Sequence, residues 1–194
     1  MKNILTLCIA TIVLFSGCEI NKKAQMEALG QCTYTIESMD RLTIGGQPVN
    51  NFMKNGQVNL AVLPSMALLL LSKDVPLEAQ VNMKITNPVA KKAAMNSFKY
   101  LIEIQGKPVF EGTVDENINL DQNQSTTIPL TFKANIFGVA KEAGFENFLN
   151  EMLTRKSEGF IALKIKPSIK IGNSNIYYPG YITVDNNLMQ RIKF

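Results

Sequence analysis

Residues 76–88, PLEAQVNMKITNP, hold the pattern that most restricts how this chain can fold. Apolar and polar residues alternate five times in succession, in the pairs Leu77-Glu78, Ala79-Gln80, Val81-Asn82, Met83-Lys84 and Ile85-Thr86. Successive side chains of a β-strand point to opposite faces of the sheet, so this period predicts a strand with one buried and one solvent-exposed face. Such strands are typical of antiparallel sheets, because parallel sheets bury both faces. Asn87-Pro88 is expected to end the strand, since proline has no N–H to donate to a neighbouring strand.

Weaker copies of this alternation run along the rest of the chain. Further strands are predicted within residues 31–36, 42–44, 58–62, 98–104, 109–114, 118–120, 128–132, 160–171 and 176–184. Asn55-Gly56 predicts a two-residue hairpin turn, because asparagine and glycine accept the positive φ angles that such a turn requires. Gly106-Lys107-Pro108 is a second predicted turn.

Two segments have the residues of a helix. One set of apolar residues falls on a single helical face: Phe145, Phe148, Leu149, Met152 and Leu153. Pro64 can begin a shorter helix filled by Met66 to Leu71, which we expect to pack against the sheet. The whole pattern predicts a mostly β fold, an antiparallel β-sandwich with one or two packed helices.

The first seventeen residues have the composition of a secretory signal peptide. Lys2 precedes an apolar run from Ile4 to Phe15, and the small residues Ser16 and Gly17 follow. The run is shorter than the roughly 20 residues that a membrane-spanning helix needs. Removal of residues 1–17 leaves 194 − 17 = 177 residues, a size typical of one domain.

Cys18 follows directly, within the stretch LFSGCE. This stretch resembles a bacterial lipobox, in which a diacylglycerol is attached to the cysteine thiol and the peptide is cut before that cysteine. The resemblance implies a lipid-anchored protein of the bacterial cell envelope, and Glu19 in place of an aspartate favours the outer membrane. An ordinary signal peptide with an incidental cysteine is the alternative. We expect residues 18–30 to form a tether and residues 31–194 a single domain, held to the membrane by acyl chains.

The residue types present exclude several kinds of chemistry. The chain has no histidine, which removes the commonest general base, the commonest metal ligand and every Ser-His or Cys-His nucleophile. Carboxylate-only and Ser-Lys chemistry remain open, although Ser65, Ser125 and Ser168 have no nucleophile-elbow context. The net charge is +4 without a clustered basic face, so no nucleic-acid partner is expected. No cofactor and no metal are expected either.

The chain has three cysteines, of which one is expected to remain as a thiol. Cys8 would leave with the signal peptide and Cys18 would carry lipid. Cys32 alternates with Tyr34 and Ile36, which predicts a small core-facing residue. An intermolecular disulfide is the alternative.

Two segments together resemble a known family. They are VNMKITNPVAKKAAMNSFKYLIEIQGKPVFEGTV and STTIPLTFKANIFGV, and their shared motif consists of Asn87-Pro88, Tyr100, Gly106 with Val109, Gly112, and Thr126 to Phe132. This ordered set resembles the late embryogenesis abundant type 2 domain, also called the water-stress and hypersensitive-response domain, over about residues 75 to 184. The resemblance implies a fibronectin-III-like sandwich with a helix, an association with desiccation and stress, and no catalytic residues.

An oxygen-rich segment could serve a metal ion. Its members occupy every second position: Asp115, Asn117, Asn119, Asp121 and Asn123. They resemble the ligands of a calcium loop, but the glycine and glutamate that such a loop needs at its sixth and twelfth places are Leu120 and Thr126. The same spacing is typical of the exposed face of a strand, which is the interpretation we favour.

Three tyrosines stand close together in the stretch YYPGY. Tyr177, Tyr178 and Tyr181 could form an aromatic platform for a sugar or a protein partner. Tyrosine is also common in strands, and Pro179-Gly180 can simply bend a strand at a sheet edge.

These features favour a non-enzymatic envelope lipoprotein whose sandwich binds, shields or scaffolds, with the stress-related role that the family resemblance implies. The expected partner is a membrane, through lipid on Cys18, while the sequence names no protein or glycan partner. The alternative is a small-ligand or carbohydrate-binding lipoprotein, or a carboxylate-dependent hydrolase. A concave polar pocket with two convergent carboxylates would favour that alternative.

Overall fold

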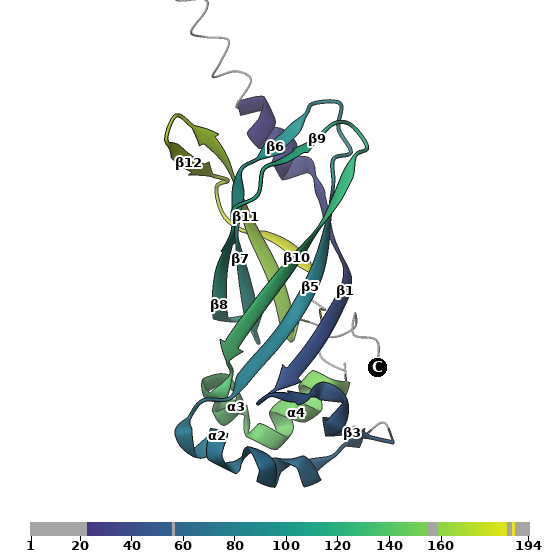
Figure 1. Ribbon diagram of the computed structural model, residues 1–194, viewed down its shortest axis with the longest axis vertical. Helices are drawn as coiled ribbons and strands as arrows, with labels where there is room; N and C mark the ends of the chain where they lie inside the picture. Colours follow the sequence, from purple (N-terminus) through teal and green to yellow (C-terminus); the bar gives the residue numbers. More distant parts are fainter. Residues whose placement is uncertain (1–22, 56, 155–158, 186–187, 189–194) are drawn as a thin grey trace, which may run out of the picture.

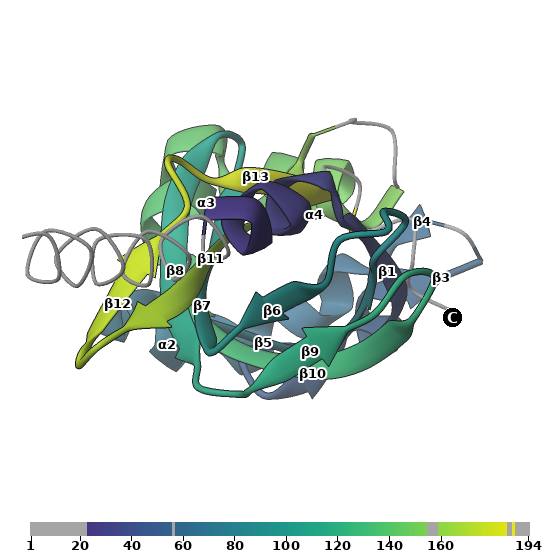
Figure 2. The ribbon, with the colours of Figure 1, turned by 90° about the horizontal axis from the view of Figure 1, so that it is seen from above.

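The computed structural model describes residues 23–55, 57–154, 159–185 and 188. Over this part of the chain the fold is mostly β, and two main sheets face each other across an apolar core (Figure 2). The predicted fold class, an antiparallel β-sandwich with packed helices, is therefore confirmed.

Each main sheet is built from antiparallel neighbours. The first sheet contains, in spatial order, β10 (Ser125–Asn135), β5 (Pro76–Thr86), β1 (Thr33–Ile44) and β2 (Gln47–Pro48). The second contains β12 (Ser174–Tyr177), β11 (Ile161–Ile171), β7 (Ser97–Ile104) and β8 (Lys107–Val114), with β13 (Ile182–Asp185) also paired to β11. Two short pairs complete the strands, β3 (Met53–Lys54) with β4 (Gln57–Val58) and β6 (Ala93–Met95) with β9 (Ile118–Leu120).

Helices lie at both ends of the elongated sandwich. They comprise residues 23–31, the 3-10 helices η1 (Val49–Phe52) and η2 (Leu60–Met66), and the α-helices α2 (Ala67–Ser72), α3 (Phe137–Ala143) and α4 (Phe145–Thr154). Figure 1 shows the helix of residues 23–31 at the upper end of the molecule and α2, α3 and α4 at the lower end. We use "upper end" and "lower end" in this sense below.

Strand β5 lies in the middle of the first sheet, between β1 and β10. Its exposure alternates as the sequence predicts, and the buried set is Leu77, Ala79, Val81, Met83 and Ile85. The predicted alternation is confirmed, and the outward-facing residues of this central strand are half-buried.

Asn87 ends β5 and is wholly buried. Its side-chain amide donates to the carbonyl oxygens of Lys91 and Leu120, at 2.9 Å each, and its side-chain oxygen accepts from the Val89 N–H. A buried amide is tolerated when its hydrogen bonds are made, so Asn87 holds the strand end in place.

Strand β1 departs from the simple alternation that begins at Tyr34 and Ile36. The pairing with β5 shifts between Ile36 and Ser38 and again between Asp40 and Thr43, and Arg41 has a φ of 54° at the second shift. Each irregularity moves the inward-facing set by one residue, first to Met39 and then to Leu42 and Ile44, which are buried. The chain thus keeps one apolar face over twelve residues although its sequence changes phase twice.

Tyr100 joins the two sheets. It pairs across β7 and β8 with Gly112, and its ring lies where a Gly112 side chain would be, since a Cβ there would stand 2.6 Å from the tyrosine oxygen. The hydroxyl donates to the carbonyl oxygen of Thr131, in the other sheet, at 2.5 Å. Gly112, part of the family motif, is a strand residue whose missing side chain makes room for this ring.

Two predicted turns have different outcomes. The β3–β4 hairpin is confirmed, with Lys54 paired to Gln57 and Asn55 at a φ of 53°. The turn predicted at Gly106-Lys107-Pro108 lies one residue earlier, because the left-handed residues are Gln105 and Gly106 and β8 already begins at Lys107.

The predicted helix at Phe145 is confirmed as α4. Its buried residues are Phe148, Leu149, Met152 and Leu153, and the Phe148 ring contacts that of Phe160 with 5.3 Å between centroids. Helix α3 precedes it and was not predicted, because its seven residues bury only Val139 and Ala140.

Residues 58–72 differ from the prediction. The strand expected at 58–62 is wrong beyond Val58, since residues from Leu60 form η2. The expected packing of Met66 to Leu71 is only partly right, because Met66 is buried whereas Leu68 and Leu71 are 79% and 78% exposed. A six-residue helix of leucines is apolar on all sides, so one side must face solvent when only the other contacts the sheets.

Part of the predicted tether is folded. Residues 23–31 form a helix whose Ala28 and Leu29 lie in the core, and Tyr34 donates its hydroxyl to the Leu29 carbonyl oxygen at 2.8 Å. The assignment of residues 18–30 to a tether is therefore wrong from residue 23 onward.

Candidate functional site

The YYPGY stretch interrupts the return strand of the last hairpin. The sequence predicted one strand within residues 176–184. The structure has two instead, because β12 and β13 both pair with β11 and residues 178–181 bulge out between them. The Tyr178 N–H still donates to the Pro167 carbonyl oxygen at 2.8 Å, and Gly180 takes a φ of 93°. Such a positive φ is easy for glycine and strained for other residues.

This bulge brings two of the three tyrosines to the outer face of the second sheet. Tyr181 donates its hydroxyl to Glu111 Oε2 at 3.1 Å, and Lys99 Nζ lies 2.8 Å from Glu111 Oε1. Lys99 Nζ also lies 5.8 Å from the centre of the Tyr177 ring, and Lys166 Nζ lies 5.7 Å from the centre of the Tyr181 ring. We call Lys99, Glu111, Lys166, Tyr177 and Tyr181 the tyrosine–lysine cluster.

The cluster balances two facing cations. Lys99 and Lys166 are directly opposite each other on β7 and β11, a placement that is unfavourable for like charges. Glu111 lies between Lys99 and the bulge, and the hydrogen bond from Lys99 and then that from Tyr181 lower the pKa of its carboxyl group. The same contact with Glu111 raises the pKa of Lys99. Both groups are therefore charged at neutral pH and unsuited to proton transfer there.

Tyr178 turns away from this cluster. A Cβ on Gly30 would stand 2.7 Å from the Tyr178 hydroxyl oxygen, so the ring packs on the helix of residues 23–31. The two elements border a surface depression of about 440 Å³ that is lined by Lys23, Met26, Glu27, Gly30, Gln31, Tyr178 and Pro179. The three tyrosines named from the sequence thus do not form one platform, since Tyr177 and Tyr181 lie together and Tyr178 lies apart.

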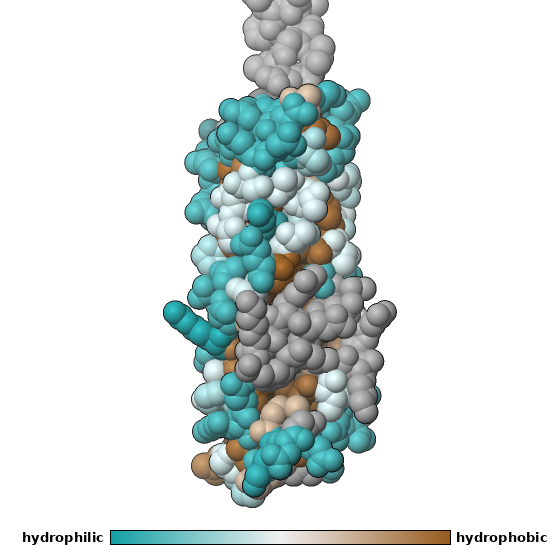
Figure 3. Space-filling view, turned by 90° about the vertical axis from the view of Figure 1, so that its right-hand side faces the viewer, coloured by the Kyte–Doolittle hydropathy of each residue, from teal (hydrophilic) through white to brown (hydrophobic). Residues whose placement is uncertain are grey.

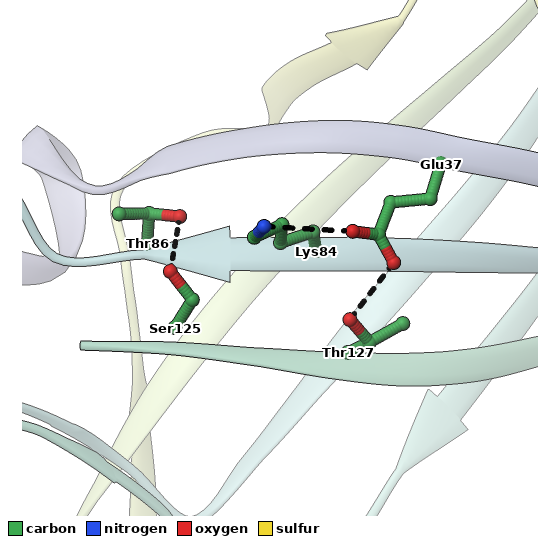
Figure 4. A network of polar contacts seen from close by, with 5 residues as sticks. All are labelled: Glu37, Lys84, Thr86, Ser125 and Thr127. Atoms are coloured by element: carbon green, nitrogen blue, oxygen red, sulfur yellow. Dashed lines mark hydrogen bonds and ion pairs between the residues drawn. The ribbon is translucent and has the colours of Figure 1, made fainter.

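The outer face of the first sheet holds a polar network that the sequence did not single out. Figure 4 shows Glu37 between two neighbours, with its carboxylate 3.6 Å from Lys84 Nζ and accepting from the Thr127 hydroxyl at 3.0 Å. Thr86 and Ser125 share a further hydrogen bond of 2.8 Å. The five residues come from β1, β5 and β10, and they tie these three strands together at the exposed surface.

A second depression of about 440 Å³ lies toward the lower part of this sheet. It is lined by Arg41, Glu78, Ala79, Gln80, Phe110, Thr131, Phe132 and Lys133. Its acid and one of its bases are paired, with Lys133 Nζ 2.8 Å from Glu78 Oε1, and this contact raises the pKa of Lys133. Each of the two depressions has one carboxylate among its lining residues, so neither offers the two convergent carboxylates of a hydrolase.

The nucleophilic side chains named from the sequence are held in structural contacts. Cys32 is buried, as predicted, and burial raises the pKa of its thiol to about 11. Ser168 is buried and donates to the Ser97 carbonyl oxygen, while the Ser65 hydroxyl donates to the carbonyl oxygen of Val62. A thiol with so high a pKa is a poor nucleophile at neutral pH.

The oxygen-rich segment follows the strand interpretation only at its centre, because Asn119 lies in β9 whereas Asp115, Asn117, Asp121 and Asn123 lie outside the strands. Ile118 and Leu120 are buried in β9, and Asn119 between them is exposed. The Asn117 side-chain oxygen accepts from the side-chain amide of Asn96 at 2.8 Å. Among the residues that the structure describes, no three His, Cys, Asp or Glu side chains gather into a metal-binding group.

Cys18, the predicted lipidation site, lies outside the described residues, as do residues 1–17 of the predicted signal peptide. Within the described ranges, no helix is both long enough and apolar enough to cross a membrane.

Comparisons with known proteins give distant similarities only. No family model and no curated protein matches the chain. A crystal structure of a protein from Archaeoglobus fulgidus is 17% identical, covering 77% of this chain and 92% of that one, with a TM-score of 0.37. The solution structure of a late embryogenesis abundant protein is 12% identical, covering 93% and 91%, with a TM-score of 0.34. A β-glucuronidase of glycoside hydrolase family 2 is 13% identical, covering 57% of this chain and 11% of that one, with a TM-score of 0.28.

Proposed function

We propose that this chain is a non-enzymatic lipoprotein of the bacterial outer membrane, anchored by lipid on Cys18. Its sandwich, which resembles the late embryogenesis abundant type 2 domain in its motifs, serves as a stress-related module that binds, shields or scaffolds. The observation that carries the proposal is the helix of residues 23–31, whose first described residue is 23 − 18 = 5 positions after Cys18 and which is packed into the core at one end of the molecule (Figure 1).

This arrangement suits an anchor. Five residues span at most about 18 Å, so a lipid on Cys18 would hold the upper end of the sandwich close to the bilayer. The two acyl chains of a diacylglycerol are enough for stable membrane binding, because each buried CH2 contributes about 0.8 kcal/mol. The sandwich itself then needs no membrane-spanning segment.

The non-enzymatic part rests on how the reactive groups are engaged. Glu111 and Lys99 neutralise each other on the outer face of the second sheet, and Glu78 and Lys133 do so on the first. The buried thiol of Cys32 has its pKa raised to about 11. The two ion pairs therefore stabilise the surface of the fold, and the buried thiol is protonated at neutral pH.

The anchor is tested by metabolic labelling with an alkyne fatty acid. The wild-type chain and the Cys8→Ser control should be labelled and found with membranes, whereas Cys18→Ser should lose the label. Equal labelling of Cys18→Ser would contradict the anchor. Turnover of an ester, glycoside or peptide that one carboxylate substitution abolishes would contradict the non-enzymatic part.

Ligand binding at the tyrosine–lysine cluster is the second candidate function. It is favoured by the placement of Tyr177 and Tyr181 on one exposed face beside two lysines. Glycan binding that disappears in Tyr181→Ala and is unchanged in Tyr178→Ala would support this reading over a purely structural cluster, because Tyr178 packs elsewhere.

A further inference from the structure

The lower end of the molecule carries leucines that contact water instead of protein. Leu68 and Leu71 stand one helical turn apart on α2 and are 79% and 78% exposed, the two highest values among the large hydrophobic side chains that the structure describes. Ala61, Pro64 and Ala67 are also exposed beside them. We call these five residues the apolar tip. In Figure 3, which views the right-hand side of Figure 1, brown and tan atoms reach the surface between teal ones at the lower end.

The tip is held firmly from behind. A Cβ on Gly45, which has a φ of 58°, would stand 2.7 Å from Leu69 Cδ1 and 2.8 Å from Met66 Cε. These two side chains therefore pack onto the turn after β1, and they orient α2 so that Leu68 and Leu71 point outward. The exposure of the leucines is a fixed feature of the fold.

The segment that carries the tip is uncharged. Residues 55–72 contain no Asp, Glu, Lys or Arg, and exposed lysines flank them at both sides, Lys54 and Lys73. Asp74 comes next, and its charge acts on Lys133, where it helps to raise that lysine's pKa. The acids of helices α3 and α4 at the same end include Glu142, which pairs with Lys107, and Glu151, which accepts from Gln105. An apolar centre with cations at its margin matches the interface of an anionic bilayer, where acyl chains lie below a layer of phosphate groups.

The shape of the tip also favours lipid over another folded protein. The tip projects from the end of the long axis (Figure 1), and its helix of six residues is only about 9 Å long. Two such convex ends cannot bury the roughly 1,200 Å² or more that a specific protein interface needs. A bilayer needs no matching groove, because acyl chains adapt to the inserted side chains.

We propose that the apolar tip inserts into the interface of a bilayer that contains anionic lipids, at the end of the molecule opposite to the helix of residues 23–31. This inference is independent of the lipid on Cys18, which concerns the upper end.

The test uses the absence of tryptophan from the chain. Leu68→Trp places a single tryptophan at the tip, and Ile176→Trp, at a position that is 46% exposed on β12, is the matched control. The full-length chain is reconstituted into unlabelled vesicles, and vesicles of brominated phosphatidylcholine and phosphatidylglycerol are then added. The fluorescence of Leu68→Trp should shift to the blue and be quenched, while that of Ile176→Trp should not change.

Charge and apolar variants check the two parts of the inference. Leu71→Asp in the Leu68→Trp chain should lower partitioning onto the brominated vesicles by about tenfold or more, because a leucine no longer enters the bilayer. Lys54→Gln and Lys73→Gln should each lower it about fivefold on anionic vesicles and leave it unchanged on neutral ones. All three positions are exposed, so the melting temperature should stay the same.

Three results would overturn the inference. The first is no quenching of Leu68→Trp, whether the bromine is in the added vesicles or in the anchoring ones. The second is equal quenching of both tryptophans by the added vesicles, which would indicate binding without orientation. The third is a blue shift that depends on protein concentration and not on lipid, which would assign the tip to a second copy of the chain. Loss of fatty-acid labelling at Cys18 leaves each of these readouts intact, so the anchor and the tip fail separately.

Discussion

Gly112→Ala is the substitution whose cost follows most directly from the structure. The new Cβ would lie 2.6 Å from the Tyr100 hydroxyl oxygen and closer still to ring carbons, so the ring must move. Movement breaks the hydrogen bond from Tyr100 to the Thr131 carbonyl oxygen, which joins the two sheets and contributes about 1 kcal/mol. Repacking an overfilled site costs about 1–3 kcal/mol more.

The net effect should be a loss of about 2–3 kcal/mol, because replacing glycine also stabilises the protein by up to about 1 kcal/mol through the unfolded chain. For a domain of this size that corresponds to a fall in melting temperature of about 4–12 °C. Urea denaturation followed by circular dichroism measures it. Gly138→Ala is the matched control, since a Cβ there meets no atom within 4 Å and alanine favours helix α3.

The cause can be separated from a general sensitivity of β8. In a Tyr100→Ala background no ring stands over the glycine, so Gly112→Ala should no longer destabilise the protein. The reasoning is refuted if Gly112→Ala unfolds at the same urea concentration as the wild type, or if its cost is the same with and without the ring.

Two further predictions concern the sheets. Val81→Asp buries an unpaired charge at a wholly buried position and should lower the free energy of unfolding by about 4 kcal/mol or more. Thr35→Asp is exposed and lies opposite Lys84 on the neighbouring strand, so it should lower it by under about 0.5 kcal/mol. Similar melting temperatures for the two variants would mean that the register is wrong. Glu111 has a folded-state pKa below its ordinary value of 4.5, so its contacts stabilise the fold above about pH 4.5 and lose that effect as the pH falls through the folded-state pKa. The difference in unfolding free energy between wild type and Glu111→Gln should therefore shrink between pH 7 and pH 3, and a difference that does not depend on pH would contradict the assigned contacts.

Strands and helices with a complete apolar stripe were predictable, because the period of the stripe alone shows which face is buried. β5 and α4 each contact the core along a complete stripe, so their sequences carry the full pattern. Strand β1 was predictable only in pieces, since its two pairing shifts change the phase at residues whose types give no warning, Glu37 and Arg41. An arginine with positive φ is a tertiary outcome, imposed by pairing with β5, and not a local preference.

The helix of residues 23–31 was missed for a related reason. It buries few residues, Ala28 and Leu29 among them, so its apolar stripe is too narrow to stand out from a polar tether. The spacing of Met26 and Leu29 was the available signal, because residues three apart share a helical face.

The tyrosine–lysine cluster could be predicted only in part. Sequence proximity identified Tyr177 and Tyr181 but also grouped them with Tyr178, which the bulge turns toward Gly30. Lys99 and Glu111 lie on strands that are far away in the sequence, and only the pairing of β11 with β7 and of β7 with β8 brings them beside the tyrosines. Such a cluster cannot be predicted from local sequence until the strand order is known.

The two proposals together limit how the protein can contact membranes. Strand β5 has eleven residues and is about 37 Å long, and the helix of residues 23–31 adds at most about 14 Å. With a linker of at most about 18 Å and about 10 Å for the helices beyond β5, an upright molecule anchored at Cys18 would present Leu68 and Leu71 no more than about 80 Å from the anchoring bilayer. A second membrane could be reached only at close apposition, and the same membrane only if the sandwich lies flat. Bromine placed in the anchoring bilayer, instead of in the added vesicles, distinguishes the two orientations. In the flat orientation Ile176→Trp would also approach that bilayer, so both tryptophans would be quenched. An upright molecule would leave the fluorescence of Leu68→Trp unchanged.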